Sequence, residues 1–353
     1  MSQALDRFSE MQKTLQQYEL AVSMLHWDLQ TASPKKGMDD KTQALGFFST
    51  EAFKITTSDE YGEILKALSE PEEFDQLSLP MQITVKRYLE DYTRYKRIPQ
   101  DFYTEFVTAG AKSSKAWKEA KKDNDFSHFE PWLDKLITMK TQYVKFQEPD
   151  AEPYEFLLDR YEKGMDSATI EKLFTELKAG LIPLLAKINA AEKPDLSALE
   201  GKYDVDAQRK VQKLLLEYIG FDFEAGTVGE TEHPFTTQLG HGDVRVTNHF
   251  YEDNPLHPIF SAIHEGGHGI YDQNVDPAYQ NTALEELHQM GLHESQSRFY
   301  ENILGRNKNF WLPIYDQVAE LLPQLKNVPL DTFWRAVNDV HPSFIRTEAD
   351  EVT

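Results

Sequence analysis

Two histidines and a glutamate between Ser261 and Tyr271 have the residue types and the spacing that metal chemistry requires. His264 and His268 are four residues apart, and Glu265 directly follows the first of them. In a helix, side chains four residues apart lie on one face, so both imidazoles can reach a single ion. Glu265 lies about 100° further round the helix, close to that ion and free to take a proton. The pattern predicts zinc-promoted hydrolysis, with both histidines as ligands and Glu265 as the general base that deprotonates a zinc-bound water.

Two of the residues between these histidines, Gly266 and Gly267, are unfavourable in a helix interior. Each costs about 1 kcal/mol relative to alanine there. We therefore expect a compensating feature, either metal ligation or the close approach of another backbone. The alternative to a metal site is a surface helix that carries two unrelated histidines.

A catalytic zinc site has three protein ligands and a water, and we predict the third ligand further along the chain. Glu294 lies 26 positions after His268, which leaves room for a turn and a second helix packed against the first. His288 and His293 are the competing candidates. We prefer Glu294, because two histidines and a carboxylate form a known peptidase ligand set and the other histidines can orient it. Alternatively, Glu294 is a surface residue paired with Arg298 at the i, i+4 spacing.

Composition excludes several classes of protein. The 37 basic and 59 acidic residues give a formal net charge of −22, so we expect no nucleic-acid partner. The sequence has no apolar run of about 18 residues, and its first residues lack a basic leader followed by an apolar core. We therefore expect no signal peptide and a cytoplasmic protein without a membrane partner. Cysteine is absent, so any metal must be bound by His, Asp or Glu. No Gly/Ser linker divides the chain, so we expect one catalytic domain over 1–353.

Helical periodicity dominates the chain as far as Gly220, with a stretch that we expect to break or kink at Pro183. The expected helices before this glycine cover approximately 8–30, 41–56, 79–97, 100–122, 129–146, 168–192 and 206–219. Beyond it, we expect helices over approximately 254–272, which carries the histidine motif, 284–304, which carries Glu294, and 333–340.

A β-hairpin is predicted just before the histidine motif. Strands over 235–239 and 243–248 are separated by a Gly-His-Gly turn. Asp243, Arg245 and Thr247 share one face, because side chains alternate along a strand. We expect this polar face to form a wall of the active site, where an extended peptide could pair with a strand edge. The alternative is an ordinary solvent-facing strand surface.

Several short motifs occur in a fixed order. They are His233-Pro234-Phe235, Asp243-x-Arg245-x-Thr247, His264-Glu265-x-x-His268, His293-Glu294-Ser295-Gln296 and Ile345-Arg346-x-x-Ala349-Asp350, with His26-Trp27-Asp28 near the N-terminus. With these motifs the sequence resembles the thermostable carboxypeptidase Taq family of zinc metallocarboxypeptidases, over essentially the whole chain.

The resemblance implies a mainly α, zincin-like fold with a small β-sheet beside the active-site groove, and commonly a homodimer. It implies His264, His268 and Glu294 as metal ligands and Glu265 as the general base. It further implies removal of single amino acids from peptide C-termini. The metal is expected to be zinc, with cobalt or manganese as alternatives.

The same resemblance implies that Arg346 recognises the substrate. A guanidinium can hold a terminal carboxylate through two hydrogen bonds. Alternatively, Arg346 pairs with Asp350 at the i, i+4 spacing. We expect Arg245 to assist in holding the substrate carboxylate. The other substrate-binding candidates from these motifs are His233, Asp243 and Thr247.

The family pattern continues past the last of these motifs to a further Gly-x-x-Gln-Asp-x-His-Trp motif, whereas this sequence ends at Thr353. We therefore expect the chain to lack the C-terminal part of the family, with the metal site intact and peptidase activity impaired. Two other functions remain open: a zinc oligopeptidase that cuts internal bonds, and a non-catalytic helical scaffold that binds partners through its acidic surface.

Overall fold

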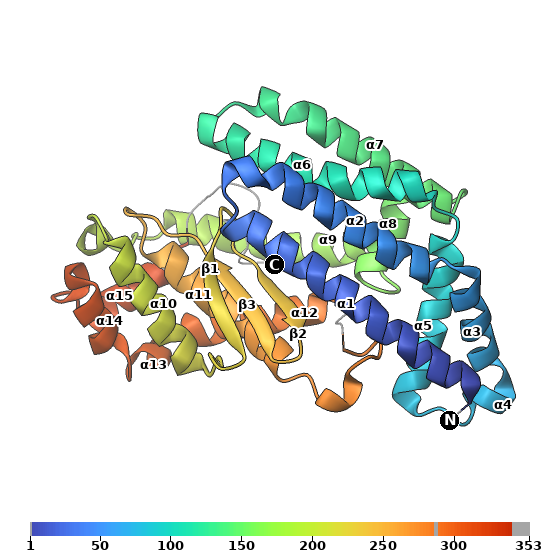
Figure 1. Ribbon diagram of the computed structural model, residues 1–353. Coiled ribbons are helices and arrows are strands. Elements are labelled where there is room, and N and C mark those ends of the chain that lie inside the picture. The colour runs from blue at the N-terminus through green and yellow to red at the C-terminus, as the bar shows by residue number, and fades with distance from the viewer. Residues whose placement is uncertain (1, 286–288, 341–353) are drawn as a thin grey trace. The chain divides into compact units, whose positions relative to one another are not determined.

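The computed structural model describes residues 2–285 and 289–340, and most of these residues are helical (Figure 1). A small sheet of three strands accompanies the helices in this part of the chain. These features confirm the predicted mainly α fold with a small sheet. Among the described helices, none combines the length and the apolar composition that crossing a membrane requires. By its internal contacts the chain divides into two compact units.

Unit 1 comprises Met1–Tyr161, Leu239–His241 and Val275–His288. Its helices are α1 (Gln3–Thr31), α2 (Met38–Thr56), α3 (Asp59–Ser69), α4 (Pro71–Phe74), α5 (Leu79–Tyr95), α6 (Gln100–Asp123), α7 (Glu130–Gln147) and α8 (Pro153–Tyr161). α1 lies alongside α2, and α2 packs on α6 (Figure 1). Phe8 of α1 and Leu65 of α3 are completely buried in one apolar cluster, because apolar residues recur at helical spacing on the facing sides.

Unit 2 comprises Glu162–Gln238, Gly242–Asn274 and Gln289–Thr353. Its helices are α9 (Ser167–Ala190), α10 (Val205–Ile219), α11 (Leu256–Gln273), α12 (Met290–Arg298), α13 (Lys308–Trp311), α14 (Tyr315–Leu321) and α15 (Leu330–Val337). A π-helix, Phe299–Gly305, continues directly from α12. The core of this unit surrounds Ile263, Trp311 and Phe333, none of which has any exposed surface.

The sheet has the order β1 (Gly226–Glu230), β3 (Asp243–Asn248), β2 (Thr236–Gly240). β2 and β3 form the predicted hairpin. β1 pairs in parallel with β3, with Gly226 opposite Val244 and Glu230 opposite Asn248. β3 packs against α11 (Figure 1). The buried Asn248 amide donates a 2.8 Å hydrogen bond to the Pro258 carbonyl, which ties the end of β3 to the first turn of α11.

α11 is buried on several sides, and its small residues make that possible. A Cβ on Gly266 would lie 2.6 Å from side-chain carbons of Leu216 and Ile219 in α10. A Cβ on Gly267 would lie 2.8 Å from the Cα of Ser297 in α12, a backbone atom that cannot move aside cheaply. The expected close approach of another backbone is therefore present at Gly267, whereas Gly266 makes room for side chains of α10.

Most expected helices are present, and the differences are local. α9 runs without interruption through Pro183, so the helix does not break there, and the kink expected as the alternative stays a prediction. The helix expected over 284–304 begins only at Met290 among the described residues, and its second half is the π-helix. β1 was not predicted, because its pairing partner, β3, lies across an intervening segment and leaves no local pattern.

The Gly267 contact predicts the effect of a single methyl group. Gly267→Ala should lower the free energy of unfolding, because overpacking costs about 1–3 kcal/mol and exceeds the helix-propensity gain of about 1 kcal/mol. The measurement is urea unfolding of the metal-free chain. Gly180→Ala in α9 is the matched control, since a Cβ there meets nothing within 4 Å and the substitution should stabilise. Equal stabilisation by both substitutions would contradict the close backbone contact.

Candidate metal centre

α11 presents two imidazoles on one face. His264 and His268 are one helical turn apart, and their ring centroids are separated by 4.9 Å. Both side chains are largely buried, with 16% and 12% of their surface exposed. The opposite side of α11 packs into the core through Ile263 and its neighbours, which fixes the direction in which the histidines point.

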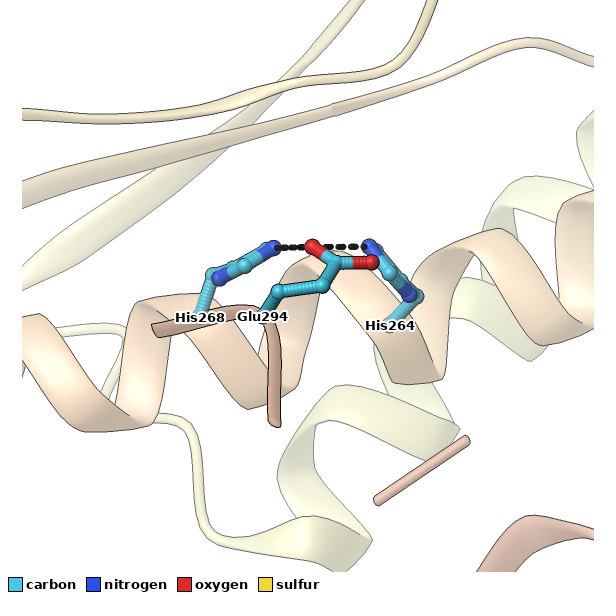
Figure 2. A group of neighbouring side chains, drawn as sticks. All are labelled: His264, His268 and Glu294. Carbon is cyan, nitrogen blue, oxygen red and sulfur yellow. Dashed lines mark ion pairs between the residues drawn. The ribbon is translucent and has the colours of Figure 1, made fainter. Parts of the chain in front are cut away.

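Glu294 from α12 completes the group (Figure 2). Its Oε2 lies 3.2 Å from Nε2 of His268 and 3.7 Å from Nε2 of His264. One atom from each of the three residues lies within 4.8 Å of the others. Two atoms that each lie 2.0–2.1 Å from a tetrahedral zinc are about 3.3 Å apart, so the two measured separations fit shared coordination of one ion. The structure thus brings together the three residues that the sequence predicted as ligands.

The donor set itself suits a divalent metal ion. Two imidazole nitrogens and one carboxylate oxygen are ligands that zinc accepts in catalytic sites, where a fourth position is left for water. The three residues therefore fit the metal that their motif predicts.

The other oxygen of Glu294 faces Arg298. The guanidinium Nε donates a 2.8 Å hydrogen bond to Oε1, so the i, i+4 pair considered as an alternative does form. It does not replace the contact with the histidines, because Oε2 remains directed at them. The hydrogen bond with His268 and the charges of His264 and Arg298 outweigh partial burial and lower the pKa of Glu294 to about 2.

His264 is held on its far side by a residue that the sequence did not reveal. Its Nδ1 lies 2.8 Å from Oε2 of Glu301 in the π-helix, and Glu301 is 7% exposed. Burial lowers the pKa of His264, but this hydrogen bond and the charges of Glu301, Glu265 and Glu294 raise it overall. Glu301 could have been suspected from its place seven residues after Glu294, since that spacing keeps two side chains on one helix face.

Glu265 lies beside the predicted ligands and is shielded from solvent. It is 7% exposed, and burial raises its pKa although the charges of His264 and His268 oppose this effect. The Thr236 hydroxyl on β2 lies 2.6 Å from Oε2 of Glu265 and fixes the carboxyl group against the sheet. A carboxyl group with a raised pKa close to a metal site is suited to proton transfer.

Of the two competing ligand candidates, His288 and His293, only His293 lies among the described residues. Nε2 of His293 lies 3.0 Å from Oδ1 of Asp272, so this atom is engaged outside the group. The His293 ring packs against the ring of His268, with centroids 4.3 Å apart, and thereby supports a predicted ligand. His288 lies outside the described residues.

The predicted substrate residues on β3 are already paired with each other or with the backbone. Arg245 binds Asp243 through two hydrogen bonds of 2.9 and 2.8 Å. Thr247 has no exposed surface, and its hydroxyl exchanges hydrogen bonds with the backbone N–H and carbonyl of Phe235, which holds β2 and β3 in register. His233 is exposed.

The last predicted substrate residue is Arg346. It lies outside the described residues, as does Asp350, the partner considered for it. Its role in recognising a terminal carboxylate stays a prediction.

Known carboxypeptidases are similar to this protein along nearly the whole chain. A family model described as "Carboxypeptidase Taq (M32) metallopeptidase" matches residues 7–353. The chain is 41% identical over 348 residues to carboxypeptidase 1 of Bacillus subtilis, covering 98% of this chain and 69% of that protein. It is 37% identical over 338 residues to thermostable carboxypeptidase 1 of Thermus thermophilus, covering 93% of this chain and 66% of that protein.

A solved structure is similar over the same extent. The crystal structure of a protein called BsuCP matches this chain with a TM-score of 0.95 and 40% sequence identity, covering 99% of this chain and 71% of BsuCP. The chain thus spans about two thirds of the length of the relatives it matches.

The lowered pKa of Glu294 predicts a pH-dependent contribution to stability. Its ionised form is favoured by the fold, so the contribution is present above pH 4.5, the ordinary pKa, and is lost as the pH falls toward 2. In the metal-free chain, Glu294→Gln should therefore lower the free energy of unfolding at neutral pH, and the difference from wild type should shrink through this range. Urea unfolding as a function of pH measures this difference in the free energy of unfolding. Glu320→Gln, at an exposed position on α14, is the control; a pH-independent difference for Glu294→Gln would contradict the electrostatic origin.

Proposed function

The chain belongs to the carboxypeptidase Taq (M32) family of metallopeptidases, as its motifs predicted, and from this premise we propose that it is a zinc-dependent carboxypeptidase that removes single amino acids from peptide C-termini. Membership places it among the metallocarboxypeptidases, a class of peptide hydrolases that use a metal ion. The observation that supports the proposal most directly is the convergence of His264, His268 and Glu294, with the buried Glu265 next to them.

Zinc is the proposed metal because the three ligands are two imidazoles and one carboxylate. When bound, a zinc ion supplies a Lewis acid for the substrate carbonyl and lowers the pKa of a water molecule to about 7. His264 and His268 contribute neutral nitrogens, and Glu294 contributes its Oε2. Cobalt and manganese remain alternatives, since the same donor types bind them.

Glu265 is the proposed general base. Its carboxyl group would take the proton of the attacking water and pass it to the leaving amine. Burial raises its pKa, which makes the carboxylate a stronger base than an exposed glutamate. Thr236 would keep one oxygen of Glu265 in place, so that the proton is received at the other oxygen.

Substrate recognition is proposed to depend on a guanidinium that holds the terminal carboxylate. Arg245 donates two of its five N–H groups to Asp243, so it would bind substrate after it leaves that partner or through N–H groups that these two bonds do not use. Arg346 is therefore the preferred candidate for the main contact. His233, Asp243 and Thr247 stay predictions, as do the homodimer, the cytoplasmic location and the single catalytic domain.

A product assay tests the exopeptidase activity. The zinc-loaded chain should release single residues from the C-terminus of an N-blocked peptide, and it should leave the same peptide with an amidated C-terminus uncut, because no carboxylate is then available. Mass spectrometry identifies the products. Internal fragments would instead support the oligopeptidase alternative, and purified chain without stoichiometric zinc that also cuts neither peptide would support the scaffold.

Substitution of the general base gives a prediction with two independent measurements. Glu265→Gln should retain zinc yet lose at least about 10²-fold in turnover, the usual contribution of a general base. The same variant should be more stable than wild type at neutral pH when metal-free. A buried carboxyl group with a raised pKa costs stability as the pH rises above 4.5, its ordinary pKa, because the unfolded chain then ionises more readily than the folded one; the neutral amide avoids this cost. Unchanged turnover would remove Glu265 from the mechanism, and lower stability would contradict the raised pKa.

A further inference from the structure

Arg298 lies between two carboxylates at the end of α12. Its Nε donates to Oε1 of Glu294 at 2.8 Å, and its Nη1 donates to Oε2 of Glu301 at 3.1 Å. The three residues share one helix face at positions i, i+4 and i+7. All are shielded from solvent to different degrees, with 32% of the Glu294, 15% of the Arg298 and 10% of the Glu301 side chain exposed.

The network continues from Glu301 to the metal centre. The same Oε2 of Glu301 lies 2.8 Å from Nδ1 of His264. Unbroken hydrogen bonds therefore run from Glu294 through Arg298 and Glu301 to His264, and they join two predicted ligands that come from different helices. A buried carboxylate such as Glu301 is tolerated only when charged and hydrogen-bonding partners offset its desolvation. Arg298 and, at 3.9 Å, Arg306 supply the charge.

The chemistry of Glu301 determines the tautomer of His264. An ionised carboxylate can only accept hydrogen bonds, so the proton of a neutral His264 must lie on Nδ1. The lone pair of Nε2 is then directed toward Glu294 and His268. His268 lacks such support, since its Nδ1 has no hydrogen-bond partner in the part of the chain that the structure describes. The protein thus orients one imidazole by a hydrogen bond and the other by packing against His293.

The position of Arg298 has a second consequence. Its guanidinium holds Oε1 of Glu294, while Oε2 lies 3.2 Å from Nε2 of His268 and 3.7 Å from Nε2 of His264. A carboxylate that offers one oxygen leaves more of the ion's surface for water and substrate than a carboxylate that offers both.

We propose that Arg298 and Glu301 are positioning residues of the metal centre: Glu301 sets the tautomer and orientation of His264, and Arg298 restricts Glu294 to a single metal-facing oxygen. The inference rests on the proposed metal function, and it assigns two residues that the motifs did not single out. It concerns metal affinity and coordination, which can be measured without turnover.

Zinc affinity is the first test. Glu301→Ala and Arg298→Met should each weaken zinc binding about 10–100-fold, the usual effect of removing a group that orients a ligand. Glu301→Gln should retain most of the zinc affinity that Glu301→Ala loses, because an amide oxygen still accepts a hydrogen bond from Nδ1–H of His264. Zn²⁺ dissociation constants are measured by competition with a chromophoric chelator, and the thermal midpoint of each metal-free variant is recorded alongside.

The control is a similar arrangement at the surface of unit 2. Arg209 also pairs with two carboxylates, Asp206 and Glu230, away from the ligand group. Arg209→Met should leave zinc affinity unchanged. Should Arg298→Met fail to fold, Arg298→Lys retains the charge but loses the planar fork that spans two carboxylates, and it should still weaken binding.

Cobalt provides the second test. In the Co²⁺-loaded Arg298→Met chain, both oxygens of Glu294 become available, so the coordination number should rise and the visible absorption should weaken relative to wild type. Glu301→Gln should leave the wild-type spectrum in place.

The results distinguish a failure of the proposed metal function from a failure of the positioning roles. Absence of zinc uptake by the wild-type chain would overturn the proposed metal function. Normal uptake by the wild type together with unchanged zinc affinity in folded Glu301→Ala and Arg298→Met would overturn the positioning roles alone, even if those variants melt at lower temperature. Weakened affinity that Glu301→Gln does not restore would overturn the role assigned to the Nδ1 hydrogen bond.

Discussion

The close contact between α11 and α12 at Gly267 is the constraint on which the candidate site depends. The absence of a Cβ there allows the backbone of Ser297 to approach α11 directly. Glu294 lies one turn before Ser297, so the same contact determines how far its carboxylate reaches across α11. In a working metal site, ligand atoms must lie within about 0.5 Å of their productive positions. A residue larger than glycine at position 267 would separate the two helices by more than that.

Three glutamates share this small volume, and their surroundings give them different properties. Glu294 has His268 and Arg298 as partners, and its pKa falls to about 2. Glu301 is buried between His264 and Arg298. Glu265 accepts a hydrogen bond from the neutral Thr236 hydroxyl, and burial raises its pKa. Environment, rather than residue type, therefore separates the proposed ligand from the proposed base.

Sheet and core support the site in different ways. The core around Ile263 and Trp311 directs one side of α11 inward, so that the histidines face the other way. β2 supplies Thr236, which holds the carboxyl group of Glu265. The small sheet thus supplies one hydroxyl to the candidate site. The active-site wall expected from the polar face of β3 stays a prediction.

The sequence by itself determined the features that depend on local spacing. The four-residue interval in the histidine motif placed both imidazoles on one face, and the alternating pattern after Thr231 indicated the hairpin, because helix and strand periodicity are properties of neighbouring residues. The choice of Glu294 needed a known ligand set as well. The neighbour of Gly267, the hydroxyl beside Glu265 and the carboxylate behind His264 were decided only by the tertiary structure, since each contact joins segments whose meeting depends on how whole helices and strands pack, and no local pattern records that packing.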